Sequence, residues 1–419
     1  MLDIKFIREN TDIVHDACTK KHITFDVDAL LALDQVRLQK LSLVETLRAE
    51  QNTVSDRIPT SGAEERVTLI AQMSLLKEDL KQHENELREI MDSWQKLMLQ
   101  VPNVPDISVP EGDDDTGNVE IRTWGEKPAL ENPKNHIELC EEFDLADFGR
   151  GAKVAGFRGY FLKNEAVQIE MALWQLFNEK LIAKGFTPMI VPSLVSEKTL
   201  TGTGYLPGGE DDLYRTQDNE YLAGTGEVAA MSYYSDEIID KSQLPIKISA
   251  FSPCFRREAG AHSKDTKGLI RVHEFFKLEQ IVLCEASHLE SVAHHETITE
   301  NVEEILRELE LPYHVVINCA GDLGQGQVKK YDIEVWMPSQ NTYRETHSAS
   351  YFHDFQTRRL NIRYRDESGN LQFVHSLNNT AVATPRIIAC ILENYQQPDG
   401  TILIPKVLQK YVGKTHITK

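Results

Sequence analysis

The sequence lacks the features that mark membrane proteins and zinc domains. None of its apolar runs is long enough to cross a bilayer. Its six cysteines lie far apart, with no C-x-x-C pair and no histidine at zinc-finger spacing, so we interpret them as buried thiols in a reducing compartment. The first residues mix acids with bases, unlike a secretory or transit peptide, and we therefore expect a cytoplasmic protein that is not held in a membrane.

Basic residues are also few relative to acids. The chain has 45 Lys and Arg against 65 Asp and Glu, which gives a formal net charge of -20 at pH 7. Because phosphate backbones are bound where Lys and Arg are concentrated, this balance argues against a protein that holds nucleic acid by its overall charge. Any contact with nucleic acid must be local. The 419 residues exceed what one hydrophobic core usually fills, so we expect two domains.

Several signature motifs of enzymes are absent. The sequence contains no G-x-x-x-x-G-K-[ST] phosphate loop, no H-E-x-x-H and no G-x-S-x-G. Glycine pairs at 149–151 and 202–204 complete no dinucleotide fingerprint and are interpreted as turns. We expect His294 and His295 to form a surface pair on a helix rather than a metal site, since adjacent helical residues point in different directions.

The N-terminal quarter of the chain has the periodicity of two long helices. In residues 67–101 apolar side chains recur at steps of three and four, which is typical of a coiled-coil seam. Residues 28–57 are rich in helix formers, and a breaker cluster at 59–62 separates the two stretches. This pattern predicts an antiparallel helical hairpin. We expect most of its bases to face solvent and a few to be able to meet a phosphate backbone; these bases are Arg37, Lys40, Arg48, Arg57, Arg66, Lys77, Lys81, Arg88 and Lys96.

A linker separates this hairpin from a second domain. Residues 102–117 combine prolines and aspartates with almost no periodicity. Beyond it, segments rich in β-branched and aromatic residues (246–255, 269–284, 313–318, 331–337) alternate with turn signals, and amphipathic helices are expected near 164–184 and 287–309. The predicted fold class is therefore α+β, with a mainly antiparallel sheet flanked by helices. We expect domains at 1–101 and 118–419.

One predicted strand carries alternating charged and aromatic side chains. Residues 271, 273, 275, 277 and 279 share parity, so one face of the sheet would present a guanidinium, an aromatic ring and a carboxylate. A nucleoside triphosphate needs this combination. For any single residue, a solvent-exposed face with ion pairs is the better explanation, but two further segments supply matching chemistry.

The first of these segments is 343–348, where Glu345 and Ser348 could place a magnesium ion that bridges phosphates. The second is 377–395, where we expect a helix to begin near residues 377–380 and to run through Arg386 to about Tyr395. Arg386 would be a further phosphate ligand.

These segments together resemble a known family, the class II aminoacyl-tRNA synthetases. The matching motifs are F-R-R-E-A-G at 255–260 with G-L-I-R-V-H-E-F at 268–275, L-N-N-T-A-V-A-T-P-R at 377–386, and I-L-E-N-Y-Q at 391–396. The helix at 164–184 followed by G-F-T-P-M-I-V-P at 185–192 is similar to the family's first motif. Because the helical hairpin precedes these motifs, the chain resembles the seryl-tRNA synthetases within that class.

The resemblance implies a function and its partners. It implies an ATP-dependent ligase that activates L-serine as seryl-adenylate and transfers it to the 3′ end of tRNA(Ser), with tRNA(Sec) as a second candidate. Residues 1–101 would be the tRNA-binding domain with its coiled-coil arm, and 118–419 the class II catalytic domain. ATP and Mg²⁺ would be required. A homodimer would form through the first-motif helix and strand.

The resemblance also implies roles for single residues. Arg256 would bind the α-phosphate, Arg271 and Arg386 the β- and γ-phosphates, and Phe275 would stack on adenine beside Glu258. The implied catalytic residues are Arg256, Glu258, Arg271 and Arg386. The implied ATP-binding residues are these four with Arg257, Val272, Phe275, Glu345, Thr346, His347 and Ser348. Glu345 and Ser348 would hold Mg²⁺. The implied serine-binding residues are Thr225, Gly226, Glu227, Glu279, Asn378 and Thr380.

The chain departs from the family pattern at a few positions. Residues that differ from the usual ones are Gly226, Arg257, Ala349, Tyr351, Asn379 and Pro385. Arg257 and Tyr351 are the ones expected to alter the pocket or the motif loop. Three alternatives remain open: a catalytically silent paralogue with a binding role, an enzyme that loads an amino acid onto a carrier protein, and an adenylate-forming enzyme for another small amino acid.

Overall fold

The computed structural model describes residues 1–260 and 265–419. Part of the polar loop expected between the two strands of the nucleotide motif, residues 261–264, lies outside the described residues. The chain divides into two compact units. One comprises residues 1–19 and 23–102, and the other comprises residues 20–22 and 103–419. No helix of the described ranges is both long and apolar enough to cross a membrane.

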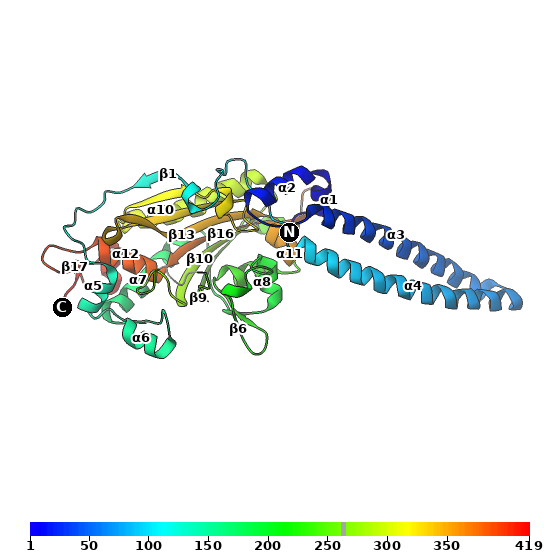
Figure 1. Ribbon diagram of the computed structural model, residues 1–419, viewed down its shortest axis with the longest axis horizontal. Helices are drawn as coiled ribbons and strands as arrows, with labels where there is room; N and C mark the ends of the chain where they lie inside the picture. The colour runs from blue at the N-terminus through cyan, green and yellow to red at the C-terminus, as the bar shows by residue number, and fades with distance from the viewer. Residues whose placement is uncertain (261–264) are drawn as a thin grey trace. The chain divides into compact units, whose positions relative to one another are not determined.

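The first unit is dominated by a pair of long helices (Figure 1). Its helices are α1 (Ile4–Glu9), α2 (Thr11–Lys20), α3 (Val27–Arg57) and α4 (Ala63–Met98). The Asp26 carboxylate caps α3 by accepting the Ala29 N–H, and the short turn η1 (Ile58–Thr60) reverses the chain before α4. Buried Val44, Leu47 and Leu80 lie on the seam between the two helices. The predicted antiparallel hairpin is therefore confirmed.

Most bases of α3 are engaged in ion pairs within the first unit. Asp34, 1% exposed, accepts from Arg8 Nε at 2.6 Å and from Arg37 Nε at 2.8 Å. Farther along the hairpin, Arg48 Nη2 lies 2.7 Å from Glu84 Oε1. Lys40 pairs with Glu86 and Arg57 with Glu65. The positive charges of α3 are therefore neutralised by carboxylates of the same unit, and the ion pairs of Lys40, Arg48 and Arg57 connect the two helices of the hairpin.

The second unit is built on a large sheet (Figure 1). Within the described residues this sheet has eight strands in the order β1-β11-β12-β13-β16-β10-β9-β4. All neighbours are antiparallel except β4, which runs parallel to β9 at the edge. The strands are β1 (Val119–Trp124), β4 (Thr187–Ile190), β9 (Ile246–Phe255), β10 (Glu274–Cys284), β11 (Tyr313–Ile317), β12 (Lys329–Met337), β13 (Thr342–His353) and β16 (His375–Ala383). The predicted α+β class with a mainly antiparallel sheet is confirmed.

Three helices cover one face of this sheet, which we call the rear face. They are α7 (Asn164–Ala183), α10 (His288–Glu308) and α12 (Thr384–Asn394), and their apolar side chains form one core with the strands. The opposite face, called here the front face, carries α9 (Glu227–Met231) beside β9 and β10. The remaining helices are α5 (His136–Glu142), α6 (Phe148–Ala155), α8 (Glu197–Thr203), α11 (Phe355–Leu360) and α13 (Lys406–Val412).

Short strands form small sheets at the margins of the second unit. They are β2 (Ala146–Asp147) with β3 (Phe161–Leu162), β5 (Leu194–Val195) with β6 (Tyr214–Arg215) and β7 (Tyr221–Leu222), β8 (Ile238–Ile239) with β14 (Arg363–Arg365) and β15 (Leu371–Phe373), and β17 (Ile402–Leu403) with β18 (His416–Ile417). The β5-β7-β6 sheet precedes α9 in the chain, and Val195 and Tyr221 of this sheet share a hydrophobic cluster with Val228 of α9.

Two boundaries differ from the sequence prediction. The expectation that a helix begins near residues 377–380 is wrong, because these residues lie in β16 between β10 and β13. The helix begins at Thr384, where Pro385 in the first turn needs no hydrogen-bond partner for its nitrogen. The strand expected from residue 269 begins only at Glu274, because β9 ends at its partner Phe255 and earlier residues have no strand to pair with.

The expectation of a surface pair at His294 and His295 is also wrong. His295 is 1% exposed, and its Nε2 donates to the backbone oxygen of Ala349 at 2.9 Å. It occupies the rear face, where α10 packs on β13. Burial lowers the pKa of His295 to about 4. The six cysteines are buried thiols, as predicted.

Candidate active site

The front face gathers the charged side chains that the sequence motifs named. Arg256 follows β9, and its Nε donates to the backbone oxygen of Gly224 at 3.2 Å. Its guanidinium carbon lies 5.5 Å from the centre of the Phe275 ring on β10. The backbone N–H of Arg256 donates to His273 O at 2.9 Å, which extends the β9–β10 pairing beyond the strands. The two strands therefore bring one guanidinium and one aromatic ring together.

Two more arginines border the same cavity. Arg271 pairs with Glu258, while Arg386 at the start of α12 donates from Nε to Ile270 O at 3.0 Å and from Nη1 to Glu345 O at 2.7 Å. The cavity measures about 50 Å³. Its lining includes most of the predicted ATP residues: Arg256, Glu258, Arg271, Val272, Phe275, Glu345, Thr346 and Arg386.

A β-bulge decides which side chains of β13 reach the front face. Ile333 on β12 opposes His347 and Glu334 opposes Glu345, so Thr346 is an extra residue on β13. The bulge reverses the alternation, and Glu345 and Ser348 consequently lie on the same face although they are three residues apart. The His347 side chain lies on the rear face, 1% exposed and stacked near Phe177 of α7.

The predicted serine-binding residues lie beside Arg256 on the front face. The Thr225 hydroxyl donates to Glu279 Oε2 at 3.2 Å, and its oxygen accepts the Glu227 N–H at 3.2 Å. Thr225 is 1% exposed and Glu227 5% exposed. A second bulge, at Ala381, sets Thr380 opposite Glu279 on the same face.

Asn378 and Lys277 complete this group. Asn378 pairs with Ile281, two residues from Glu279, so it too has the front-face parity. Lys277 forms an ion pair with Glu279 and also borders the cavity that contains Arg256. The site therefore joins an acidic, hydroxyl-rich part to an arginine-rich part.

The carboxylates of the two parts titrate differently. Burial raises the pKa of Glu227, and the neighbouring Glu279 raises it further. Burial would also raise the pKa of Glu345, but attraction to Arg386 and Lys330 holds it below its ordinary value. Glu345 is thus an anion that can bind a cation, whereas the charged form of Glu227 would be stabilised by an added positive charge.

Sequence reasoning missed side chains that hold these carboxylates. The Tyr205 hydroxyl donates to Glu227 Oε2 at 3.0 Å, and Gln356 Nε2 donates to Glu227 Oε1 at 2.7 Å. On β12, Lys330 Nζ lies 3.0 Å from Asp332 Oδ2, and Asp332 opposes Ser348. No local sequence pattern places Tyr205 or Gln356 at the site. The alternation of side chains along β12, however, could have predicted that Lys330 and Asp332 face it.

The departures from the family pattern lie on both faces of the sheet, and one of them, Pro385, borders the arginine-rich cavity. Tyr351 is fully buried, with its ring against His295 on the rear face and its hydroxyl donating to Asp106 Oδ2 at 2.8 Å. Asn379 donates to Ile298 O at 2.6 Å, also on the rear face. A Cβ at Gly226 would lie 3.2 Å from Ser252 Oγ, a tight but small conflict. Arg257 is exposed.

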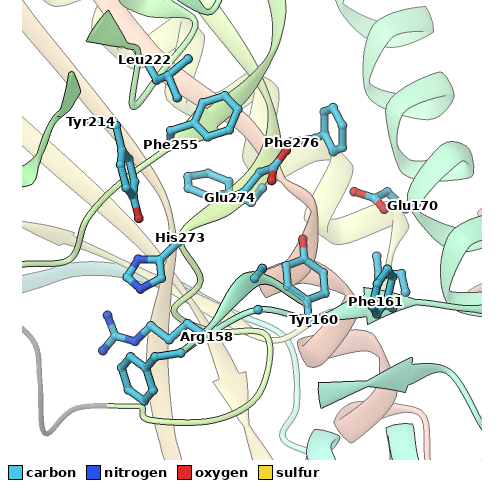
Figure 2. A pocket seen from close by; sticks show the side chains of 15 residues that line it. Arg158, Tyr160, Phe161, Glu170, Tyr214, Leu222, Phe255, His273, Glu274 and Phe276 are labelled. Atoms are coloured by element: carbon cyan, nitrogen blue, oxygen red, sulfur yellow. The ribbon is translucent and has the colours of Figure 1, made fainter. Parts of the chain in front are cut away.

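A larger cavity of about 420 Å³ lies at the end of β9 and β10 (Figure 2). Tyr160, Glu170, Tyr214 and His273 surround it, and the Phe275 ring borders both this cavity and the arginine-rich one. Glu170 of α7 accepts from the Thr384 hydroxyl at 2.6 Å, and burial raises its pKa. This cavity adjoins the arginine-rich one but carries neither Arg271 nor Arg386.

Comparison with known proteins gives the same order of parts. The family model described as "Seryl-tRNA synthetase N-terminal domain" matches residues 1–105, and the one described as "tRNA synthetase class II core domain (G, H, P, S and T)" matches residues 211–395. A serine--tRNA ligase of Deinococcus radiodurans is 45% identical over 415 residues, covering 99% of this chain and 98% of the relative. This chain belongs to the seryl-tRNA synthetase family.

Solved structures of family members agree over the full length. The seryl-tRNA synthetase of Pyrococcus horikoshii, complexed with ATP, matches with a TM-score of 0.92 at 41% identity and covers 100% of this chain and 99% of its own. The cytoplasmic serine-tRNA ligase of Naegleria fowleri, in complex with AMP, matches with a TM-score of 0.88 at 30% identity and covers 100% and 99%. The motif resemblance in the sequence is thereby confirmed.

Proposed function

We propose that this protein is a serine--tRNA ligase that forms seryl-adenylate from L-serine and ATP and transfers the seryl group to the 3′ end of tRNA(Ser). The observation that carries this proposal is the convergence of Arg256, Arg271 and Arg386 with the Phe275 ring on one face of the sheet. Adenylation is an in-line displacement at phosphorus, so it depends on placing the phosphates and neutralising their charge. The ATP bound to the Pyrococcus horikoshii relative supports this assignment.

Each arginine would take a phosphate that suits its position. Arg256 lies next to the serine-binding residues, so it would hold the α-phosphate where the serine carboxylate attacks. Arg271 and Arg386 are paired with Glu258 and Glu345, and ATP would exchange these carboxylate partners for β- and γ-phosphate oxygens. Phe275 would stack on the adenine.

Glu345 and Ser348 fit a magnesium ion. The bulge at Thr346 gives them a common face, Glu345 is an anion, and Mg²⁺ prefers one or two protein oxygens together with phosphates. When bound, the ion would neutralise phosphate charge in the displacement.

The acidic part of the site would hold serine. The serine ammonium would lie near Glu227 and Glu279, where its positive charge would stabilise the buried Glu227 carboxylate, since Lys277 already pairs with Glu279. Thr380 would contact the substrate hydroxyl beside Glu279. Because alanine would leave those polar groups without a partner, the pocket would reject it strongly.

The hairpin would contact the tRNA through one stripe of α4. Arg66, Lys77, Lys81 and Arg88 are separated by 11, 4 and 7 residues, close to whole helical turns, so they share a face. Unlike the bases of α3, they form no ion pair among the described side chains. Such a local stripe suits recognition of a long variable arm by its backbone, despite the acidic net charge. tRNA(Sec) is the second candidate substrate.

The protein would act as a homodimer in the cytoplasm. Met171 on α7 is 59% exposed and Ile190 on the edge strand β4 is 87% exposed, and both border an apolar cavity of about 600 Å³ with Trp174 and Phe251. A second copy of the same helix and strand would cover this surface. The buried thiols favour a reducing compartment.

Pyrophosphate exchange with purified protein tests the proposed reaction. Exchange is expected with serine, and far more weakly with threonine, alanine and glycine. Absence of exchange with all four would favour a silent paralogue, and exchange with another amino acid would change the substrate. Charging of tRNA should then require the long variable arm of the tRNA. An enzyme that loads an amino acid onto a carrier protein would charge no tRNA at all.

A further inference from the structure

His136, the first residue of α5, lies between a carboxylate and a backbone amide of the nucleotide motif. Its Nδ1 is 2.9 Å from Glu393 Oε1, and its Nε2 accepts the N–H of Leu269 at 3.2 Å. His136 is 3% exposed and Glu393 is fully buried. The three residues come from α5, α12 and the segment before β10, so the imidazole joins parts of the chain that are far apart in sequence.

The two hydrogen bonds determine the tautomer and orientation of the His136 ring. Burial would raise the pKa of the Glu393 carboxyl, but hydrogen bonds from His136 and Ser339 hold it below its ordinary value. As an anion, Glu393 requires His136 Nδ1 to be the donor. The Leu269 N–H requires a lone pair on Nε2. Both ring nitrogens are thus committed, and the ring has one tautomer and one orientation.

The backbone around Leu269 is shaped to this ring. Gly268 has a φ of +95°, which glycine adopts without strain, and a Cβ there would lie 2.3 Å from His136 Nε2. The close approach is therefore possible only for a glycine. The absence of a side chain at Gly268 is an observation independent of the hydrogen bonds, and it likewise indicates a close contact between His136 and the segment that contains Leu269.

The segment that His136 holds leads directly to Arg271. Residues 269–273 precede β10, so they have no strand partner for most of their backbone groups. Ile270 O accepts from Arg386 Nε at 3.0 Å, and Leu269 N–H is held by His136. Arg386 and Glu393 lie seven residues apart on α12, about two helical turns, so one side of this helix supports the segment at both points.

We propose that His136, oriented by Glu393, is a positioning residue for ATP: it holds the Leu269 backbone and thereby places the Arg271 guanidinium in the nucleotide cavity. This inference rests on the proposed function, because it assigns Arg271 to the ATP phosphates. His136 itself does not border the cavity that contains Arg271, so it contacts no substrate. Its effect should be selective for ATP over serine, whose binding residues are held by other contacts.

Two substitutions at residue 136 separate the two hydrogen bonds. In His136→Asn the amide nitrogen stands near the Nδ1 position and can still donate to Glu393, but the acceptor for Leu269 is lost. In His136→Gln the amide oxygen stands near the Nε2 position and can accept the Leu269 N–H. We expect His136→Asn to raise KM for ATP about tenfold, the equivalent of one buried hydrogen bond, with KM for serine within about twofold. His136→Gln should lie closer to the wild type.

Amide hydrogen exchange in the absence of substrates provides a second readout. The Leu269 amide should exchange faster in His136→Asn than in the wild type, with His136→Gln between them. An unchanged KM for ATP in His136→Asn, or a parallel rise in both KM values, would overturn the proposal. Should His136→Asn not fold, Glu393→Gln carries the test: it weakens the support of the ring, and an unchanged KM for ATP would again refute the inference. A wild-type protein without serine-dependent exchange would instead refute the proposed function.

Discussion

The Arg386 guanidinium lies 2.7 Å from the backbone oxygen of Glu345 and 3.7 Å from its carboxylate. Its Nε meanwhile donates to Ile270 O. One side chain at the start of α12 thus contacts both β13 and the segment before β10. The planar, five-donor guanidinium is suited to this geometry, whereas an ammonium could satisfy only part of it.

Arg386→Lys should reduce serine-dependent pyrophosphate exchange by roughly 100-fold or more, the usual effect of removing one donor from a charge-stabilising site. The charge is kept, so the loss would come from the fork geometry. Arg122→Lys is the control, since Arg122 pairs with Glu303 near the other edge of the sheet. Equal exchange rates in both variants would contradict a phosphate role for Arg386.

Thr225→Val should raise KM for serine about tenfold while KM for ATP stays near the wild-type value. The substitution keeps the shape of the side chain but removes the hydroxyl that donates to Glu279 and accepts from Glu227 N. Thr225→Ser keeps the hydroxyl and is the matched control. Steady-state exchange kinetics with each substrate varied in turn would measure both constants. A rise in KM for ATP alone would contradict the placement of the serine site.

Reversing three charges of the α4 stripe, with Lys77→Glu, Lys81→Glu and Arg88→Glu together, should raise KM for tRNA and leave pyrophosphate exchange unchanged. Each lost phosphate contact should also reduce the slope of log KM against log salt by roughly 0.7 to 0.9. The exchanged pair Arg48→Glu with Glu84→Arg keeps the net charge and is the control. If the triple variant charges tRNA normally, the stripe does not contact it.

Ile190→Glu should weaken the proposed dimer by roughly 30-fold or more, because a carboxylate would be buried without a partner. Ile190 is 87% exposed on the edge strand. Leu289→Glu, at a residue that is 79% exposed on α10, is the control. Light scattering over a concentration series would measure both. A wild-type protein that remains monomeric at high concentration would refute the dimer itself.

Folding stability should fall as pH decreases from about 6.5 to about 4, partly because of His295. Its pKa in the folded state is lowered to about 4 from 6.5, so in this window the unfolded chain binds a proton that the folded one does not. Each such histidine contributes a slope of about 1.4 kcal/mol per pH unit. His295→Gln, which can still donate to Ala349 O, should make the slope shallower by that amount in chemical denaturation. The exposed His416→Gln is the control.

Much of the architecture could be predicted from the order of residues. The periodicity of residues 67–101 and the breaker at 59–62 were sufficient for the hairpin, because a coiled-coil seam is a local repeat of apolar side chains. The motifs also named Arg256, Arg271 and Arg386, which border one cavity. Regular alternation in β10 likewise predicted that Phe275 and Glu279 share a face.

Other features depended on contacts that no local pattern contains. His295 stands among residues typical of a helix surface, yet in the packed chain it faces the sheet and donates to Ala349 O on β13. Residues 377–380 precede a real helix, but their backbone pairs with strands more than twenty residues away. In each case tertiary pairing overrode a reasonable local expectation.

The sequence by itself determined the types of groups that the site contains and the helical arm that precedes it. Only the tertiary structure decided on which face of the sheet the site residues lie and which side chains hold them in place. Glu345 and Ser348, three residues apart, would lie on opposite faces of a regular strand, and the bulge at Thr346 gives them a common one. Likewise, His136 meets Leu269 across 133 residues. The physical reason is that a strand's register and a side chain's hydrogen-bond partner are properties of the packed chain, whereas periodicity and motif chemistry belong to neighbouring residues.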